Sequence, residues 1–485
     1  MKKIIYAGAF VALMAAGNAE AQIGQPWIHD PATLTFSDGK WWTFGTGGGG
    51  ICTEDGWTWM VDKRIKTGAG AAPDVVKIGD RYLIGYSSTG GGLGGGHEGH
   101  VLTRWNLSLD PSSPVFNYSE PIEVASSKYD EDCDAIDIGF LLDPTSGRLF
   151  ITYGTYFGNI RQVELDPKTG GRLEGAVDKD VAIDCEASVM MYEDGWYYLL
   201  GTHGTCCDGV NSTYNIVVGR SRNPEGPFID NVGRDMLEGG GRMVIAAGNR
   251  KTGAGHFGRT IIDEGVQIMS CHFEADYDRS ARSVLDVRPL LWRNNWPVAG
   301  EHFKEGVYSI ESERRGYSLE LEVDFVCQQV ERANHWNMDP AEPYKSLEVQ
   351  KLEDVIDTWP KGNTTVRCSD YMFRPHQKWQ ITAVPEAGGY LSDPYFKITI
   401  AGTNRALAAT ADLELETVPE YTGADNQLWR IEQLTDGTYR IMPKQIPGKE
   451  GVNTKYCIYS QSDSNPTLAK YDFHSDNSKW NFRQH

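Results

Sequence analysis

The chain has 485 residues, of which 46 are Lys or Arg and 66 are Asp or Glu, for a formal net charge of −20. A surface this acidic repels phosphate backbones, which argues against nucleic acid as a partner. The length accommodates one large domain and a smaller one, and the 54 Gly and 23 Tyr favour strands and turns over long helices.

The N-terminus has the pattern of a secretory signal peptide. Met1-Lys2-Lys3 is followed by an apolar stretch from Ile4 to Ala16 and by the small-residue site Ala19-Glu20-Ala21. We expect cleavage after Ala21, and the apolar stretch is too short to cross a bilayer. The pattern predicts a protein exported to the periplasm or the extracellular space, with no membrane span.

Five short segments in the first two thirds of the chain resemble one another. Each joins a turn signal containing Gly to an aromatic or β-branched run, which predicts a hairpin entering a strand. The segments are Asp38–Phe44, Gly79–Tyr86, Ser146–Tyr153, Asp194–Leu200 and Asp263–Met269. Strand repeats of this size indicate the blades of an all-β propeller around a central axis.

In four of the five segments an ionisable residue stands nine or ten positions before the turn glycine: Asp30, Asp137, Glu186 and His256. The second segment has only small residues there. Equivalent positions in successive blades converge on the axis, so we expect these side chains to gather in one funnel. Three carboxylates and a histidine gathered in this way suit catalysis. Each acid alone could equally be a turn residue or a hydrogen-bonded structural residue.

The nine cysteines form no CxxC pairs and no Cys/His clusters at zinc spacing. An exported chain can form disulfides, and an odd count leaves at least one thiol unpaired. For the adjacent Cys206 and Cys207 we expect two separate roles rather than a vicinal disulfide.

A second pattern follows Gly306. Gln377-Lys378-Trp379, Gln427-Leu428-Trp429 and Ser478-Lys479-Trp480 form a threefold repeat, which predicts a pseudo-threefold β domain with a buried Trp in each unit. The motifs resemble the Gln-x-Trp signature of the ricin-type β-trefoil, with serine replacing Gln in the third repeat. Leu407–Ala409 and Ile458–Ser460 lack the acid through which such trefoils often hold sugars. A spacer role is therefore an alternative to a lectin role.

Further motifs surround the acids of the first region and cover most of residues 27–300. They are His29-Asp30-Pro31, Ala72-Pro73-Asp74-Val75-Val76 with Tyr82 and Tyr86-Ser87, Ala135-Ile136-Asp137-Ile138-Gly139, the run from Cys206 to Ser221, and Val287-Arg288-Pro289-Leu290-Leu291-Trp292 with Trp296-Pro297-Val298. Together they resemble glycoside hydrolase family 43, and within it the arabinanase-like and arabinofuranosidase-like members.

The resemblance implies an inverting, five-bladed propeller enzyme. Asp30 matches the general base, Glu186 the general acid, and Asp137 the residue that orients the acid and tunes its pKa. Inversion needs a carboxylate that deprotonates water on one face of the sugar and an acid that protonates the leaving oxygen on the other. A neighbouring anion such as Asp137 raises the pKa of Glu186 and keeps it protonated.

Other residues are candidates for binding metal or substrate. His256 resembles a fifth-blade histidine that points to an axial cation, usually calcium, held largely through water, although calcium prefers oxygen ligands. Trp27 is a candidate for stacking a sugar ring, and His203 and Ser212 are candidate contacts to sugar hydroxyls. Ala71 stands where the family usually has Trp, so the preferred sugar stays open.

The sequence thus predicts a signal peptide at 1–21, a five-bladed β-propeller catalytic domain at 22–305 and a β-trefoil-like domain at 306–485. The expected protein is an inverting glycoside hydrolase that releases α-L-arabinofuranosyl residues from plant cell-wall polysaccharides or their oligosaccharides. An endo-arabinanase, a β-xylosidase and a galactofuranosidase are alternatives on the same fold. A non-catalytic carbohydrate-binding protein is an alternative of another class.

Overall fold

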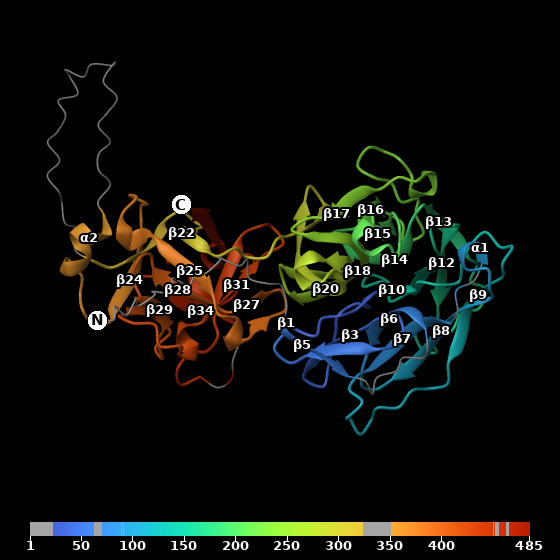
Figure 1. Cartoon of the computed structure of the whole chain (residues 1–485), viewed down its shortest axis with the longest axis horizontal. Helices are drawn as coiled ribbons and strands as arrows, with labels where there is room; N and C mark the ends of the chain where they lie inside the picture. Colours follow the sequence, from blue (N-terminus) through green and yellow to red (C-terminus); the bar gives the residue numbers. More distant parts are fainter. Residues whose placement is uncertain are drawn as a thin grey trace, which may run out of the picture.

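The computed structural model describes residues 23–62, 70–88, 90, 92–323, 351–449, 451, 455–461 and 465–485. The predicted signal peptide lies outside these residues. Figure 1 shows the described chain as two bodies side by side, the first running from blue to yellow-green and the second from yellow to red. None of the described helices has the length and apolar character needed to cross a lipid bilayer.

Within the described residues the first body consists of five sheets that follow one another along the chain. The first sheet contains β1 (Ile23–Gly24), β2 (Thr35–Ser37), β3 (Lys40–Phe44), β4 (Gly50–Thr53) and β5 (Thr58–Asp62). The second contains β6 (Ala71–Ile78), β7 (Arg81–Ser88), β8 (Gly99–Asn106) and β9 (Ile122–Ser127), with α1 (Gly92–Gly95) between β7 and β8. The third contains β10 (Gly139–Leu142), β11 (Leu149–Tyr153), β12 (Asn159–Leu165) and β13 (Lys179–Ile183). The fourth contains β14 (Glu186–Glu193), β15 (Trp196–His203), β16 (Asn215–Ser221) and β17 (Arg242–Ile245). The fifth contains β18 (Lys251–Asp263), β19 (Val266–Asp276), β20 (Arg282–Arg293) and β21 (Trp296–Ala299). These sheets are the blades of a five-bladed β-propeller, which confirms the predicted fold.

The repeated sequence segments begin at the turns that join β2 to β3 in the first blade and the first two strands in each of the other four blades. In blade one Ser37 pairs with Lys40 across a two-residue loop, in which Asp38 has φ 52° and Gly39 has φ 80°. In blade four Asp194 and Gly195 occupy the same place with φ 46° and 76°. Two consecutive positive φ angles define the type I′ turn, whose twist matches that of the flanking strands. The Asp-Gly pairs therefore set the strand register.

Side chains from neighbouring blades tie the propeller together. The buried carboxylate of Asp74 in blade two accepts hydrogen bonds from the Thr33 amide of blade one, at 3.0 Å, and from the Phe140 amide of blade three, at 2.9 Å. The ring closes where the N-terminal segment meets blade five, with the Leu285 amide donating to the Pro26 carbonyl at 2.8 Å. Asp74 of the Ala-Pro-Asp motif thus joins three blades.

The second body is built on a ten-stranded sheet within the described residues, together with two two-stranded sheets. Its strands are β22 (Gly306–Ser312), β23 (Ser318–Leu321), β24 (Thr364–Ser369), β25 (Trp379–Ala383), β26 (Gly389–Tyr390), β27 (Asp393–Pro394), β28 (Phe396–Ile400), β29 (Ala406–Ala409), β30 (Leu415–Val418), β31 (Trp429–Gln433), β32 (Tyr439–Pro443), β33 (Tyr456–Tyr459), β34 (Thr467–Lys470) and β35 (Trp480–Gln484). The short helix α2 (Leu352–Val355) precedes β24. Short 3₁₀ turns in the two bodies are η1 (Gly209–Asn211), η2 (Met236–Glu238), η3 (Tyr277–Arg279), η4 (Ile356–Thr358), η5 (Pro375–Gln377), η6 (Pro385–Ala387), η7 (Asp425–Gln427) and η8 (Asp476–Ser478).

The three repeated tryptophans hold equivalent places in this second body. Trp379, Trp429 and Trp480 are each fully buried, and each indole N–H donates to a backbone carbonyl at 2.8–3.1 Å. The side-chain oxygen of Gln377 accepts a hydrogen bond from a backbone amide five residues earlier, at 2.7 Å. Ser478 makes the matching bond with its hydroxyl, at 3.4 Å from the Asp472 nitrogen. Serine therefore preserves the contact in the third repeat.

The two bodies touch directly. The Trp292 amide of β20 donates to the Thr435 carbonyl at 2.8 Å, and the Thr435 amide donates to the Gly265 carbonyl at 2.9 Å. The Arg440 guanidinium, 1% exposed, lies 3.2 Å from the Asp263 carboxylate. The β18–β19 turn of blade five is therefore part of the contact between the two bodies.

Candidate active site

Each blade places a non-glycine residue in the left-handed region of φ near the start of its first strand. These residues are Asp30 (φ 53°), Ala72 (44°), Asp137 (63°), Ala187 (46°) and His256 (60°). Positive φ is costly for residues with a Cβ and persists where the surrounding structure enforces it, often at functional sites. Three of these residues are the predicted Asp30, Asp137 and His256, whereas in blade four the left-handed residue is Ala187, one position after Glu186, and in blade two it is Ala72.

Asp137 and Glu186 lie next to each other at the junction of blades three and four. The Ala187 amide, directly after Glu186, donates to Asp137 Oδ2 at 3.1 Å, and both acids are at least nine-tenths buried. Burial raises the pKa of Glu186, and the nearby Asp137 and Asp30 carboxylates raise it further. Burial and Asp30 also raise the pKa of Asp137. Glu186 is therefore held as a protonated acid near neutral pH.

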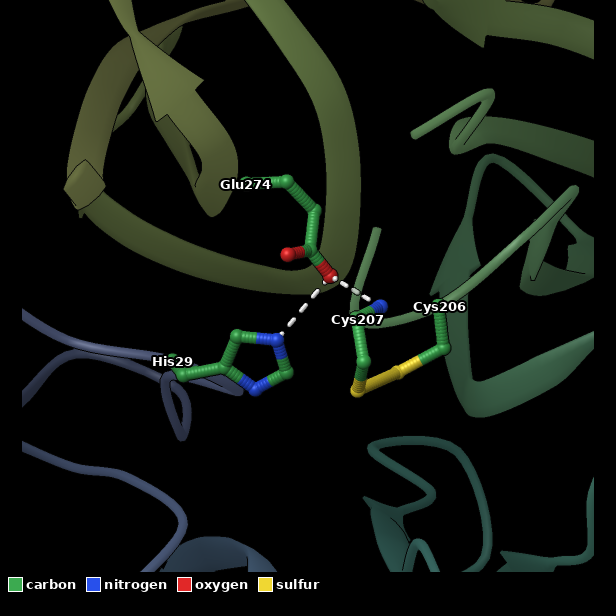
Figure 2. Close-up of side chains that lie close together, drawn as sticks. All are labelled: His29, Cys206, Cys207 and Glu274. Carbon is green, nitrogen blue, oxygen red and sulfur yellow. Dashed lines mark hydrogen bonds and ion pairs between the residues drawn. A yellow bond between two sulfur atoms is a disulfide. The ribbon is translucent and has the colours of Figure 1, made fainter. Parts of the chain in front are cut away.

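Across from these acids, blade five contributes Glu274 from β19. Its Oε1 lies 3.0 Å from His29 Nε2 and accepts a hydrogen bond from the Cys207 amide at 3.0 Å (Figure 2). Cys206 and Cys207 are joined by a disulfide, so the expectation of separate roles for them is wrong. The same amide contact ties the loop that carries the disulfide to blade five.

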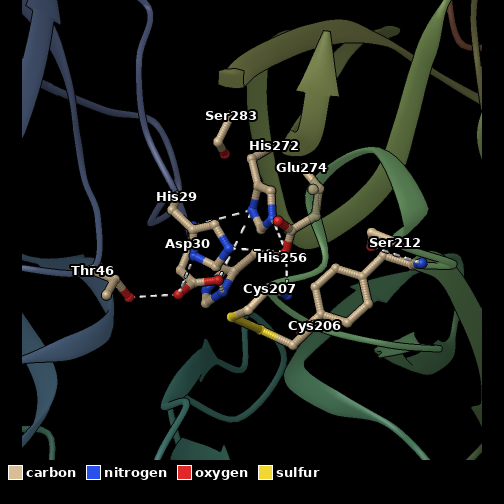
Figure 3. A network of polar contacts seen from close by, with 12 residues as sticks. His29, Asp30, Thr46, Cys206, Cys207, Ser212, His256, His272, Glu274 and Ser283 are labelled. Atoms are coloured by element: carbon tan, nitrogen blue, oxygen red, sulfur yellow. Dashed lines mark hydrogen bonds and ion pairs between the residues drawn. A yellow bond between two sulfur atoms is a disulfide. The ribbon is translucent and has the colours of Figure 1, made fainter. Parts of the chain in front are cut away.

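Asp30 lies at the centre of a polar network (Figure 3). Its Oδ2 accepts a hydrogen bond from Thr46 Oγ1 at 2.5 Å and pairs with His29 Nδ1 at 2.9 Å. Its Oδ1 lies 3.6 Å from His256 Nδ1. Burial disfavours the charge on Asp30, but the His256 and His29 rings outweigh that effect and hold its pKa well below the usual range. Asp30 is therefore an ionised carboxylate with 17% of its side chain exposed.

Contacts within the protein bring the four ionisable residues together. Glu186 faces Thr202 in the β14–β15 pair, the Thr202 hydroxyl accepts the His256 amide at 2.9 Å, and His256 Nδ1 lies 3.6 Å from Asp30 Oδ1. Their protonation states differ. Asp30 is ionised and can accept a proton, whereas Glu186 is protonated and can donate one. Two carboxyl groups whose environments push their pKa values apart are suited to act as a general base and a general acid.

Trp27 lies at a pocket next to Asp30. It lines a pocket of about 410 Å³ together with His29, Thr46 and Arg282. The Arg282 guanidinium lies 4.1 Å from the centre of an indole ring face of Trp27. The indole is thus held at a pocket that adjoins Asp30 through His29 and Thr46, where stacking of a sugar ring remains a prediction.

His203 ends β15 and Ser212 lies in the loop between β15 and β16, and the polar atoms of both residues are bonded within the protein. The His203 ring lies 3.2 Å from Asn215 Nδ2 and 3.3 Å from Asp184 Oδ2. The Ser212 hydroxyl donates to the Thr205 carbonyl at 2.8 Å, and the residue is 6% exposed. Contacts of these two residues with substrate also remain predictions.

Sequence reasoning missed His272 and Glu274. They stand two positions apart on β19, which is buried along its whole length. Alternation along the strand puts Met269, Cys271 and Phe273 in an apolar cluster and the two polar residues on the opposite face. A His and a Glu at positions i and i+2 of a buried strand form the signal that could have revealed them.

A calcium ion at His256 requires several oxygen ligands. His256 Nδ1 is buried without a hydrogen-bond partner among the described residues and lies 3.6 Å from one carboxylate oxygen, Asp30 Oδ1. Groups of three or more potential ligand side chains among the described residues are His29, Cys206, Cys207 and Glu274, and His29, Asp30 and His272. Neither group includes His256, and the sulfurs of the first are bonded to each other. The residues do not fit a calcium ion bound directly by side chains, and a water-held ion stays a prediction.

Comparisons with known proteins agree with this geometry. The family model Glycosyl hydrolases family 43 matches residues 49–297, and the model Ricin-type beta-trefoil lectin domain-like matches residues 375–448. The extracellular endo-alpha-(1->5)-L-arabinanase 1 of Bacillus subtilis is 27% identical over 298 residues, covering 56% of this chain and 87% of the relative. The extracellular exo-alpha-(1->5)-L-arabinofuranosidase ArbA of Cellvibrio japonicus is 27% identical over 308 residues, covering 56% and 86%. The crystal structure of an exo-1,5-alpha-L-arabinanase from a bovine ruminal metagenomic library superposes with a TM-score of 0.52 at 27% identity, covering 59% of this chain and 98% of that one.

Proposed function

Because the chain belongs to glycosyl hydrolase family 43, we propose that this glycoside hydrolase releases α-L-arabinofuranosyl residues from arabinan or its oligosaccharides by an inverting mechanism. The observation that carries the proposal is the gathering of three carboxyl groups from different blades: Asp137 holds the amide directly after Glu186, and His256 links the Glu186 partner Thr202 to Asp30. The opposite pKa shifts of Asp30 and Glu186 agree with it.

In the proposed reaction Asp30 removes a proton from a water molecule, whose oxygen attacks the anomeric carbon as the glycosidic bond breaks. Glu186 gives its proton to the leaving oxygen. The enzyme thus takes up one proton at Asp30 and releases one from Glu186. An inverting pair needs carboxyl groups roughly 6.5–9.5 Å apart to admit the water. Asp30 on blade one and Glu186 on blade four approach the axis from different blades, which suits such a gap.

Asp137 supports the acid. Its Oδ2 holds the amide directly after Glu186, which fixes the backbone that carries the acid, and its charge raises the pKa of Glu186. Both contributions match the role of orienting and tuning the acid.

Relatives of equal identity are named as endo- and exo-acting enzymes, so the products decide between the two modes. Debranched arabinan should yield arabinose from the first time point. Early release of oligosaccharides without arabinose would favour the endo alternative.

The names of these relatives, which include the word extracellular, also support export of the protein. The second body is proposed as a sugar-binding module or a spacer.

The direct test is hydrolysis of 4-nitrophenyl α-L-arabinofuranoside. Wild type should turn the substrate over, and Glu186→Ala and Asp30→Ala should lose about 10²- to 10⁴-fold in kcat, the usual contribution of an acid or base. The matched control is Glu174→Ala, which removes an exposed glutamate of the same body and should keep wild-type activity. Absence of turnover by wild type on arabinosides, xylosides and galactofuranosides would favour the non-catalytic carbohydrate-binding alternative.

A further inference from the structure

We propose that His29 and Glu274 are positioning residues that hold the base Asp30 through a chain of hydrogen bonds anchored at the disulfide loop. The inference rests on the proposed function, in which Asp30 takes the proton from water. Neither residue reaches the reacting atoms in this scheme, because each acts through the next member of the chain.

The chain of contacts runs across two blades and one loop. The Cys207 amide donates to Glu274 Oε1 at 3.0 Å, the same oxygen lies 3.0 Å from His29 Nε2, and His29 Nδ1 lies 2.9 Å from Asp30 Oδ2. Both ring nitrogens of His29 therefore face carboxylate oxygens. A carboxylate only accepts hydrogen bonds, so both nitrogens donate, and the ring that satisfies both contacts is the imidazolium.

The charges along the chain agree with this state. Burial disfavours the charge on His29, but the hydrogen bonds that its ring donates to Asp30 and Glu274 outweigh burial and raise its pKa to about 10. Burial also opposes ionisation of Glu274, yet its contacts with His272, His29 and Cys207 lower its pKa to about 2. Glu274, 6% exposed, is therefore a buried anion whose charge is balanced by the ring that also holds the base.

The contacts also distinguish the two oxygens of the base. His29 and Thr46 both bind Oδ2, whereas Oδ1 lies 3.6 Å from His256 Nδ1 and 4.0 Å from His272 Nδ1. The latter two separations exceed hydrogen-bond distance, so Oδ1 is the oxygen free to accept a proton from water. The His272 ring packs on His29 with centroids 4.4 Å apart, and its Nδ1 accepts the Asp30 amide at 3.1 Å. This packing fixes the plane of the His29 ring and with it the direction of Oδ1.

The test compares Glu274→Gln and His29→Ala with wild type on 4-nitrophenyl and 2,4-dinitrophenyl α-L-arabinofuranoside. Wild-type turnover is measured first, because its absence would refute the proposed function itself. We expect kcat to fall roughly 10- to 100-fold in both variants, part of the contribution of a general base, with KM within about twofold of wild type. A base acts on water and not on the leaving group, so the loss of kcat should be equal for the 4-nitrophenyl and the 2,4-dinitrophenyl substrate. The loss in Glu186→Ala should shrink with the better leaving group.

Two further measurements separate positioning from a merely structural role. Imidazole added to His29→Ala should restore part of kcat, and it should have no effect on Glu274→Gln. The matched controls are His100→Gln and Glu123→Gln, which break a half-exposed His–Glu pair with a 2.7 Å contact in blade two and should keep wild-type kcat. Circular dichroism checks that each variant is folded. If Glu274→Gln does not fold, Glu274→Asp is measured in its place.

An unchanged kcat in the folded variant of Glu274 overturns the inference. A loss that shrinks with the better leaving group overturns it too, because the residue would then serve the acid. Failure of imidazole to restore any activity to His29→Ala also contradicts it.

Discussion

Replacing Asp137 with asparagine removes the charge beside the general acid and keeps the shape of the side chain. Asp137 Oδ2 holds the Ala187 amide at 3.1 Å, which puts the carboxylate next to the backbone of Glu186. A charge close to a carboxyl group shifts its pKa by about 1–3 units, and each unit corresponds to about 1.4 kcal/mol. Loss of the anion therefore lowers the pKa of Glu186 by about one unit or more.

The sign of the effect on activity follows from the role of the acid. Glu186 works protonated, so activity is present below its pKa and lost as the pH rises through it. A lower pKa moves the alkaline limb of the kcat/KM profile to lower pH. A shift of one unit leaves about tenfold less protonated acid at any pH well above the limb. Burial and Asp30 raise the pKa of Asp137 as well, so its charge acts most fully on the alkaline side, where this limb lies.

The assay is kcat/KM for an aryl α-L-arabinofuranoside across the pH range in which the enzyme is stable. Asp166→Asn, in a turn of the same blade where Asn is well tolerated, is the control and should keep the wild-type profile. An alkaline limb that stays in place or moves to higher pH in Asp137→Asn would refute the reasoning.

Three further predictions concern binding and stability. Trp27→Ala should raise KM for arabino-oligosaccharides roughly 3- to 10-fold at unchanged kcat, because one aromatic stacking contact is worth about that much binding free energy. Initial-rate kinetics measure both constants, and a fall in kcat alone would contradict the prediction. Gly139→Ala puts a Cβ 2.1 Å from the Ser188 carbonyl oxygen between blades three and four, so it should cost about 1–3 kcal/mol and lower Tm, whereas an unchanged Tm would show that the contact can relax. Trp429→Ala empties a fully buried site and should cost about 3–5 kcal/mol, so calorimetry should show earlier melting of the second body, while hydrolysis of a small aryl substrate below that transition should persist.

The propeller could be predicted because its signals are local. The Asp38-Gly39 and Asp194-Gly195 pairs specify tight turns by their own φ preferences, and a glycine with positive φ (Gly79, Gly147 and Gly265) stands at the matching turn of the other three blades. Equivalent offsets from such turns then placed Asp30, Asp137 and Glu186 together without any knowledge of long-range contacts.

The rest of the site depends on contacts between segments that are far apart in the chain. Glu274 reaches His29 only because blade five meets blade one where the ring closes, and nothing in the sequence around Glu274 indicates that meeting. The disulfide was missed for a similar reason. Adjacent cysteines form one only in a particular loop conformation, and the loop carrying Cys206 and Cys207 bonds to Glu274, which is far away in the sequence.

Proton NMR of the first product formed from an α-L-arabinofuranoside tests most directly whether Asp30 and Glu186 act as a water-activating base and a proton-donating acid. Spectra taken before mutarotation should show the β-anomer of arabinose, since water enters on the face opposite the leaving group. Initial appearance of the α-anomer would mean that a carboxylate attacks the sugar itself, and it would contradict the roles given to both residues.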